Sequence, residues 1–267
     1  MFTRMRRTKF NEIALKMDCA ENFTMFFVGD SITEGAGASS ADHTYVAAFS
    51  KNLTERYPNH NVIRYDGQLY PIDPREAELK PLKTYGEPIR IQDGTMGTLT
   101  VVRSGVGGNT VYRMLNRKDD FICREVGGRI ADLLLINVGV NDAIASNKDK
   151  YAPPAVYREN LIELLDQIES AMPNTDIVLI TPTYNDLGDS SDSCLDDYSA
   201  MMKQIAMERS IPVIDLHSQW MEHLVVGAEN YGQGDWLTGR RGDSTHPSDV
   251  GAKAMADVIY QTLLYTV

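Results

Sequence analysis

Apolar runs alternate along the chain with segments of helical period. The runs have the length and continuous character of strands that are covered on both faces. They occupy residues 25–28, 133–136, 177–180 and 212–215, with a weaker run at 61–64. Between them, apolar residues recur at spacings of three and four around Val46, Tyr157, Leu195 and Met255, and Ser248 is predicted to cap the last of these helices. The alternation predicts an α/β fold with helices on both faces of a parallel sheet.

Two segments interrupt this pattern. Residues 66–97 carry several prolines, and an Asp93-Gly94 turn signal between Ile91 and Leu99 predicts a β-hairpin. Residues 226–242 are rich in glycine and lead directly into Asp243. Because the chain shows no internal repeat and no interdomain linker, we expect one domain, residues 1–267, with two insertions.

Composition and charge exclude several classes of protein. The chain of 267 residues is 43% hydrophobic and 24% charged, with a formal net charge of −11. This acidic balance argues against a nucleic acid partner. The one basic cluster is predicted to be a solvated terminal tail and comprises Arg4, Arg6, Arg7 and Lys9. Because we find neither a secretory signal nor a run of ~20 apolar residues, we expect a cytoplasmic protein without a membrane partner.

Cysteines and acidic clusters predict neither disulfides nor metal sites. Cys19, Cys123 and Cys194 are odd in number and widely separated, which favours a reducing compartment and buried or incidental thiols. The acidic run 186–192 lacks the ligand spacing of an EF-hand loop. We therefore expect no metal and no cofactor.

Ser31 and His246 are the candidate nucleophile and base. Ser31 follows the first apolar run and Gly29-Asp30, at the carboxyl end of a strand, where ligands bind in open α/β sheets. His246 lies three residues after Asp243, so one turn can bring both side chains to one side. The carboxylate can then orient the imidazole, and the imidazole can take the serine proton. The alternatives are a turn serine and a structural histidine; the other histidines, predicted to be structural, are His43, His60, His217 and His223.

Gly108 and Asn141 are the candidate donors for a developing oxyanion. Each follows a further predicted strand. A glycine lets a backbone N–H approach a substrate oxygen closely, and an asparagine amide adds a donor without charge. Together with the Ser31 N–H they would form a three-donor oxyanion hole. The alternatives for the glycines are a flexible loop or a phosphate-binding loop, but no Gly-Lys-Ser/Thr follows them.

The order of these segments resembles the SGNH hydrolases, also called the GDSL esterase/lipase family, from about Phe26 to the C-terminal helix. The blocks that carry the resemblance are Gly29-Asp30-Ser31-Ile32, Gly107-Gly108-Asn109-Thr110, Gly139-Val140-Asn141-Asp142 and Asp243-Ser244-Thr245-His246. The resemblance implies a flavodoxin-like three-layer α/β/α sandwich and ester hydrolysis through an acyl-enzyme on Ser31, without metal or cofactor. The chain departs from the family pattern at Ile32, where leucine is usual, and at Arg103, where the second block often opens with asparagine.

Within this family, residues 104–111 and 181–184 look similar to intracellular acetyl-xylan and xylooligosaccharide esterases. This narrower resemblance implies a small-molecule ester, an acetylated sugar, as substrate. The candidate substrate-binding residues are Asp30, Tyr184, Tyr231 and Trp236. Aromatic residues near a site also serve for packing alone. An acyltransferase, a lysophospholipase or thioesterase, and a carbohydrate-binding protein without activity are alternatives, and the sequence leaves a homo-oligomer open.

Overall fold

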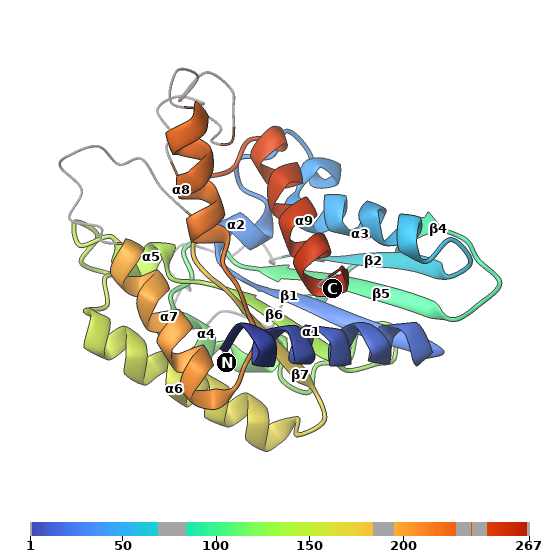
Figure 1. The fold of residues 1–267 in the computed structure, drawn as a ribbon, viewed down its shortest axis with the longest axis horizontal. Coiled ribbons are helices and arrows are strands. Elements are labelled where there is room, and N and C mark those ends of the chain that lie inside the picture. The colour runs from blue at the N-terminus through green and yellow to red at the C-terminus, as the bar shows by residue number, and fades with distance from the viewer. Residues whose placement is uncertain (1, 69–83, 184–194, 228–235, 237–244, 266–267) are drawn as a thin grey trace.

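A parallel sheet forms the centre of the molecule (Figure 1). The computed structural model describes residues 2–68, 84–183, 195–227, 236 and 245–265. The first strand, β1 (Asn22–Gly29), lies in the middle of the sheet and pairs in parallel with β5 on one side and with β6 on the other. The parallel strands are, in spatial order, β2 (Asn61–Gln68), β5 (Thr98–Gly105), β1 (Asn22–Gly29), β6 (Leu133–Asn137), β7 (Asp176–Ile180) and β8 (Val213–Ile214). All five predicted runs are therefore strands, and β5, the strand expected before Gly108, completes the centre.

The β2 edge of the sheet is antiparallel. β3 (Thr84–Tyr85) and β4 (Ile89–Gln92) both pair with β2 in antiparallel sense. Because β5 pairs with β2 along its other edge, β4 and β5 are not partners and the predicted hairpin is wrong. The Asp93-Gly94 segment instead crosses from one side of β2 to the other. The Asn61 side chain accepts a hydrogen bond from the Gly94 N–H at 3.0 Å, which ties this crossing to the start of β2.

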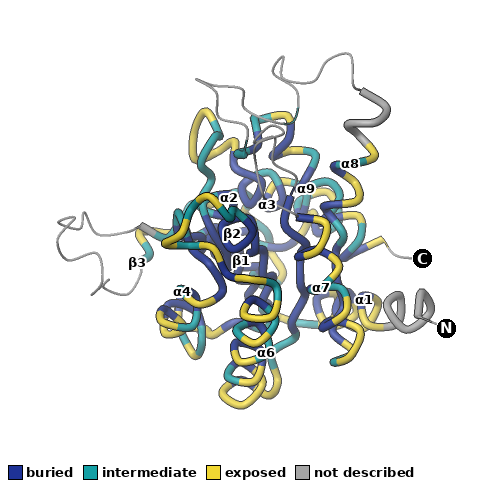
Figure 2. The backbone as a smooth tube through the Cα atoms, turned by 90° about the vertical axis from the view of Figure 1, so that its left-hand side faces the viewer, coloured by how far each residue is buried: buried dark blue, intermediate teal, exposed yellow. Residues whose placement is uncertain are grey.

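Helices cover both faces of the sheet, as the α/β/α prediction requires (Figure 2). On one side α3 (Tyr45–Arg56) packs against α9 (Asp249–Leu264). On the other, α4 (Val111–Asn116) packs against α6 (Pro154–Ala171), which also contacts α7 (Leu195–Arg209). The Ser248 hydroxyl accepts a hydrogen bond from the Gly251 N–H at 3.1 Å, so the predicted cap is confirmed.

The N-terminal segment is a helix, so the basic cluster does not form an irregular tail, while its member Lys9 is exposed to solvent as predicted. α1 (Phe2–Cys19) packs against α9 and buries Phe10, Ile13 and Met17. Their spacing places them on one face of a helix, which removes apolar surface from water. Cys19 and Cys123 are exposed free thiols rather than buried ones, and Cys194 lies outside the described residues.

Short helices at the sheet edge complete the described fold. α2 (Ser31–Glu34) follows β1 and α5 (Val140–Ala143) follows β6. The remaining elements are η1 (Ala41–His43), η3 (Lys118–Asp120) and α8 (Leu216–Gly227). Among the described residues, no helix is long and apolar enough to cross a membrane.

Candidate active site

Ser31 stands at the carboxyl edge of the sheet, on the turn between β1 and α2. Gly29 is in register with Gly105 on β5 and with Asn137 on β6, so three strands end together here. The Asp30 carboxylate caps α2 by accepting a hydrogen bond from the Ile32 N–H at 2.9 Å. This bond fixes the backbone around Ser31, whose own N–H belongs to the first turn of the helix and has no intrahelical partner.

His246 reaches Ser31 from a segment 215 residues further along the chain. Its Nε2 lies 2.8 Å from the Ser31 Oγ, which is hydrogen-bonding distance. The close approach of the two segments depends on Gly37, which has a φ of +91°. A Cβ atom at Gly37 would lie 2.7 Å from the His246 Cβ and 2.6 Å from the Pro247 carbonyl oxygen. The sequence did not single out Gly37, because only the fold shows what lies against it.

The loops after β5 and β6 bring the predicted oxyanion donors to the same place. A Cβ atom on Gly107 would lie 3.9 Å from the Ser31 Cβ, so this loop runs beside the nucleophile. The Asn141 amide donates to the Asn109 carbonyl oxygen at 2.9 Å and keeps a second N–H. No acceptor within the described part of the chain pairs with the N–H of Ser31 or of Gly108.

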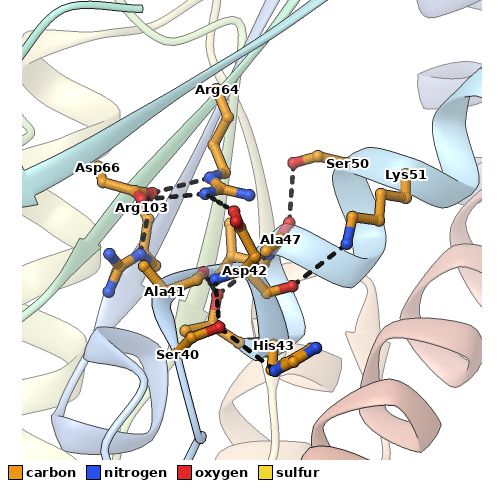
Figure 3. Close-up of polar contacts among 12 residues, drawn as sticks. Ser40, Ala41, Asp42, His43, Ala47, Ser50, Lys51, Arg64, Asp66 and Arg103 are labelled. Carbon is orange, nitrogen blue, oxygen red and sulfur yellow. Dashed lines mark hydrogen bonds and ion pairs between the residues drawn. The ribbon is translucent and has the colours of Figure 1, made fainter. Parts of the chain in front are cut away.

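Ion pairs join Arg64 and Arg103 to Asp66, and Arg64 to Asp42 (Figure 3). Arg103 donates to the Glu34 carbonyl oxygen from Nη1 and to the Asp66 carboxylate from Nε, the latter at 3.0 Å. Arg64 is fully buried and donates to Asp66 at 3.0 Å and to Asp42 at 2.9 Å. Arg103 therefore supports the nucleophile turn from β5.

Asn109 supplies the amide support that Arg103 does not. Its Nδ2 donates to the carbonyl oxygen of Gly29 at 3.1 Å, directly before the nucleophile turn. The departure from the family pattern at Arg103 thus leaves the turn with two supports, one ionic and one amide.

Two buried carboxyl groups next to the site have raised pKa values. Burial raises the pKa of Asp30 to about 6, against the opposing effects of its hydrogen bond to Ile32 and of the charges on His246 and Lys150. Burial likewise raises the pKa of Asp142 to about 7. One oxygen of Asp142 accepts a hydrogen bond from the Val111 N–H at 3.1 Å. Both groups therefore change charge within the range of pH in which most enzymes work.

Two basic side chains flank the oxyanion donors, and no motif pointed to them. Lys150 donates to the Asn141 Oδ1 at 3.4 Å, and Arg113 donates to the Gly108 carbonyl oxygen at 3.2 Å. Desolvation lowers the pKa of Lys150, and the charge of Arg113 lowers it further. Both residues lie in segments without a recognisable motif, so only the fold brings them to the site.

Several of the predicted residues are placed elsewhere or lie outside the described residues. Asp243, Tyr184 and Tyr231 fall outside them, and their roles stay predictions. Trp236 packs edge to face against Trp220, with ring centroids 4.9 Å apart. Its carbonyl oxygen also accepts a hydrogen bond from Ser248 at 2.8 Å. Its proposed contact with a sugar stays a prediction as well.

Three of the other histidines have partners of their own, and the side chain of His223 is not among those that the structure describes. The His217 Nε2 lies 2.6 Å from the Asp196 carboxylate, and the His43 Nδ1 lies 2.7 Å from the Ser39 hydroxyl. His60 is buried with its ring edge to face against Tyr57. In the described ranges, no cluster of three or more His, Cys, Asp or Glu side chains could hold a metal ion.

A serine hydroxyl presented to an imidazole at the edge of an α/β/α sandwich, beside paired amide donors, defines a carboxylic ester hydrolase. The family follows from the sequence as a whole. The sequence model of the GDSL-like lipase/acylhydrolase family matches residues 25–259, so the chain belongs to this family.

Solved structures show the same fold. An acetyl xylan esterase, AlAXEase, is 19% identical over 90% of this chain and 98% of its own, with a TM-score of 0.61. A lipase/acylhydrolase from Enterococcus faecalis is 20% identical over 91% and 96%, with a TM-score of 0.58. A catalytic mutant of an acetylxylan esterase from Geobacillus stearothermophilus is 22% identical over 90% and 94%, with a TM-score of 0.60. A comparison with curated protein sequences gives no match.

Proposed function

We propose that this ester hydrolase removes acetyl groups from carbohydrate through an acyl-enzyme on Ser31. The observation that carries the mechanism is the distance of 2.8 Å between the Ser31 Oγ and the His246 Nε2. It places a base within reach of the one proton that must leave the nucleophile. The acetyl-sugar substrate is supported by the acetyl xylan esterases among the structures that share the fold.

In the first half of the reaction, the Ser31 Oγ attacks the ester carbonyl carbon while His246 Nε2 takes the hydroxyl proton. The negative charge on the carbonyl oxygen is bound by the N–H groups of Ser31 and Gly108 and by the Asn141 amide. The C–O bond to the alcohol then breaks, and His246 returns the proton to the leaving alcohol. Asp243 is assigned the role of orienting the imidazole.

In the second half, water attacks the acyl carbon while His246 takes its proton; the bond between the acyl carbon and the Ser31 Oγ then breaks, His246 returns the proton to Oγ, and the carboxylic acid leaves. The loss of one oxyanion donor typically costs on the order of 10²–10³ in kcat. The roles of Gly108 and Asn141 are therefore testable separately from that of Ser31.

The decisive variant is Ser31→Ala, with Ser146→Ala as the matched control because Ser146 is exposed and outside the site. We expect Ser31→Ala to reduce the turnover of 4-nitrophenyl acetate by about 10⁴-fold or more, since it removes the nucleophile. Ser146→Ala should retain the rate. Unchanged turnover in Ser31→Ala would contradict the mechanism.

The substrate class needs a second measurement. Acetate release from acetylated xylooligosaccharides is compared with hydrolysis of 4-nitrophenyl esters of increasing chain length. We expect the acetyl esters to be preferred. A preference for acyl chains of about eight or more carbons would contradict the acetyl-sugar assignment. Acetylated product formed from an added sugar acceptor would instead identify an acyltransferase.

A further inference from the structure

Lys150 and Arg113 bring two positive charges to one point beside the oxyanion donors. A Cβ atom at Gly108 would lie 2.9 Å from the Lys150 Nζ and 3.6 Å from the Arg113 Nη1. Gly108 has a φ of +74°, so this loop conformation suits glycine and keeps the space between the two cations free of a side chain. Both side chains are partly buried. Both cations therefore lie against the same side of Gly108, where one small group bound beside the glycine can reach them together.

Neither cation touches an acid in the described part of the chain, although the charge of the buried Asp30 acts on Lys150 from a distance and opposes the effect of its desolvation. Within the described ranges, no Asp or Glu oxygen forms an ion pair with Lys150 or Arg113, and both donate only to neutral oxygens. This is notable in a chain of net charge −11, where acids outnumber bases by 37 to 26. Two partly desolvated cations that repel each other lower the free energy of the site when an anion binds between them.

We propose that the ester cleaved at Ser31 carries an anionic group, a carboxylate, close to the scissile bond, and that Lys150 and Arg113 bind it. The inference rests on the proposed ester cleavage at Ser31 and names the substrate class of the same site; its acyl-side form replaces the acetyl group by a charged acyl group. On the alcohol side such a substrate is an acetylated sugar acid. On the acyl side it is a half-ester of a dicarboxylic acid.

A purely structural role for Lys150 makes a different prediction. Its bond to the Asn141 Oδ1 also orients the amide so that the Nδ2 faces away from the lysine. If orientation were its whole role, loss of Lys150 would slow neutral and anionic esters by the same factor. If it binds the substrate's carboxylate, the anionic ester suffers more. The ratio of the two rates therefore separates the roles.

The experiment uses two matched pairs of substrates, each differing only in charge. For the alcohol side, acetate release is measured from O-acetylated glucuronic acid and from O-acetylated glucuronamide. For the acyl side, methanol release is measured from monomethyl succinate and from methyl succinamate. We expect the wild-type enzyme to favour the anion about tenfold or more in kcat/KM in one pair, and that pair identifies the side that carries the charge.

The variants are Lys150→Gln and Arg113→Gln, with Lys150→Arg as the conservative change. Each glutamine variant should lower the anionic-to-neutral ratio of kcat/KM by about tenfold, mainly through KM, because one charge-assisted contact is lost. Lys150→Arg should restore most of the ratio. Lys148→Gln is the matched control, since Lys148 is exposed two residues away, and it should keep the wild-type ratio. Added salt should reduce the preference and leave the neutral rate unaffected.

Equal rates on anionic and neutral esters in both pairs would overturn the proposal, as would a ratio that Lys150→Gln leaves unchanged. Failure of the proposed function is recognised separately. In that case neither member of a pair is hydrolysed, or Ser31→Ala keeps the wild-type rate on the neutral esters. Measurement of the melting temperature of each variant shows whether a lost rate reflects lost folding.

Discussion

Two pairs of basic side chains flank the nucleophile turn, and their surroundings differ in one respect. Arg64 and Arg103 share the Asp66 carboxylate, and Arg64 also pairs with Asp42 (Figure 3). Lys150 and Arg113 meet only neutral oxygens among the described residues. The first pair is in direct contact with two acids, whereas the second is offset only by the charge of Asp30 acting on Lys150 from a distance. Removal of one partner from a buried ion pair destabilises the fold, whereas a cation that touches no acid is available to a ligand.

The largest expected effect comes from breaking the ion pairs of Arg64. Arg64→Met should lower the free energy of unfolding by about 3 kcal/mol or more, because it leaves carboxylates without the buried cation that they face. Arg90→Met is the control, since Arg90 forms an exposed pair with Asp93 and should cost less than about 1 kcal/mol. Urea denaturation measures both values. Similar small losses in the two variants would show that burial of Arg64 does not matter.

The buried carboxyl group of Asp142 extends the comparison from basic to acidic side chains. The pKa of Asp142 is raised by burial to about 7, so the folded protein holds a proton that the unfolded chain releases near pH 4. Stability should therefore fall as the pH rises from about 4 to about 7. Asp142→Asn should flatten this slope, by about 2–4 kcal/mol between pH 5 and pH 8.

Urea denaturation at the two pH values tests the role of Asp142. Asp119→Asn serves as the control because Asp119 is exposed, and it should keep the wild-type slope. A slope that Asp142→Asn leaves as steep as the wild type would assign the proton to a different group.

The smallest effect is expected at Asp42, the exposed acidic partner of Arg64. The hydrogen bond from Arg64 lowers the pKa of Asp42 below its ordinary value of 3.8, but the Asp42 side chain is 68% exposed. Solvent therefore screens the interaction, and Asp42→Asn should cost less than about 1 kcal/mol at neutral pH.

The pH dependence of this loss has a definite sign. The stabilisation from Asp42 is present above pH 3.8 and disappears as the pH falls through the lowered pKa, so variant and wild type should converge in acid. Thermal melts at pH 7 and pH 3 measure this. A gap that stays constant between the two pH values would contradict an ionic origin.

The sequence predicted the elements that depend on local pattern. The five strand runs are present in the sheet, and Ser31, Gly108 and Asn141 follow strands that end at one edge. Hydrophobic runs and turn residues record burial and backbone shape directly, so they can be recognised without coordinates. The GDSL family assignment is confirmed by the match over residues 25–259.

The sequence did not predict features that depend on which segments meet. Asp93-Gly94 has the local signal of a hairpin. Both flanking strands, β4 and β5, nevertheless pair with β2, which lies some thirty residues earlier in the chain. Lys150 has no motif, because its position beside Asn141 arises only when two loops converge. The apolar residues of α1 are interspersed with charged residues, so the sequence alone did not indicate a packed helix. The structure explains them by the packing of α1 on α9.

The central position of β1 has a consequence for how the chain acquires its structure. Its apolar residues pair with β5 on one side and with β6 on the other, so neither edge is covered until residues 98–105 and 133–137 are available. During synthesis at least one edge of β1 therefore stays unpaired for more than a hundred residues. Such a strand is prone to self-association, and we expect chaperone binding to nascent chains to decline once residue 137 has left the ribosome.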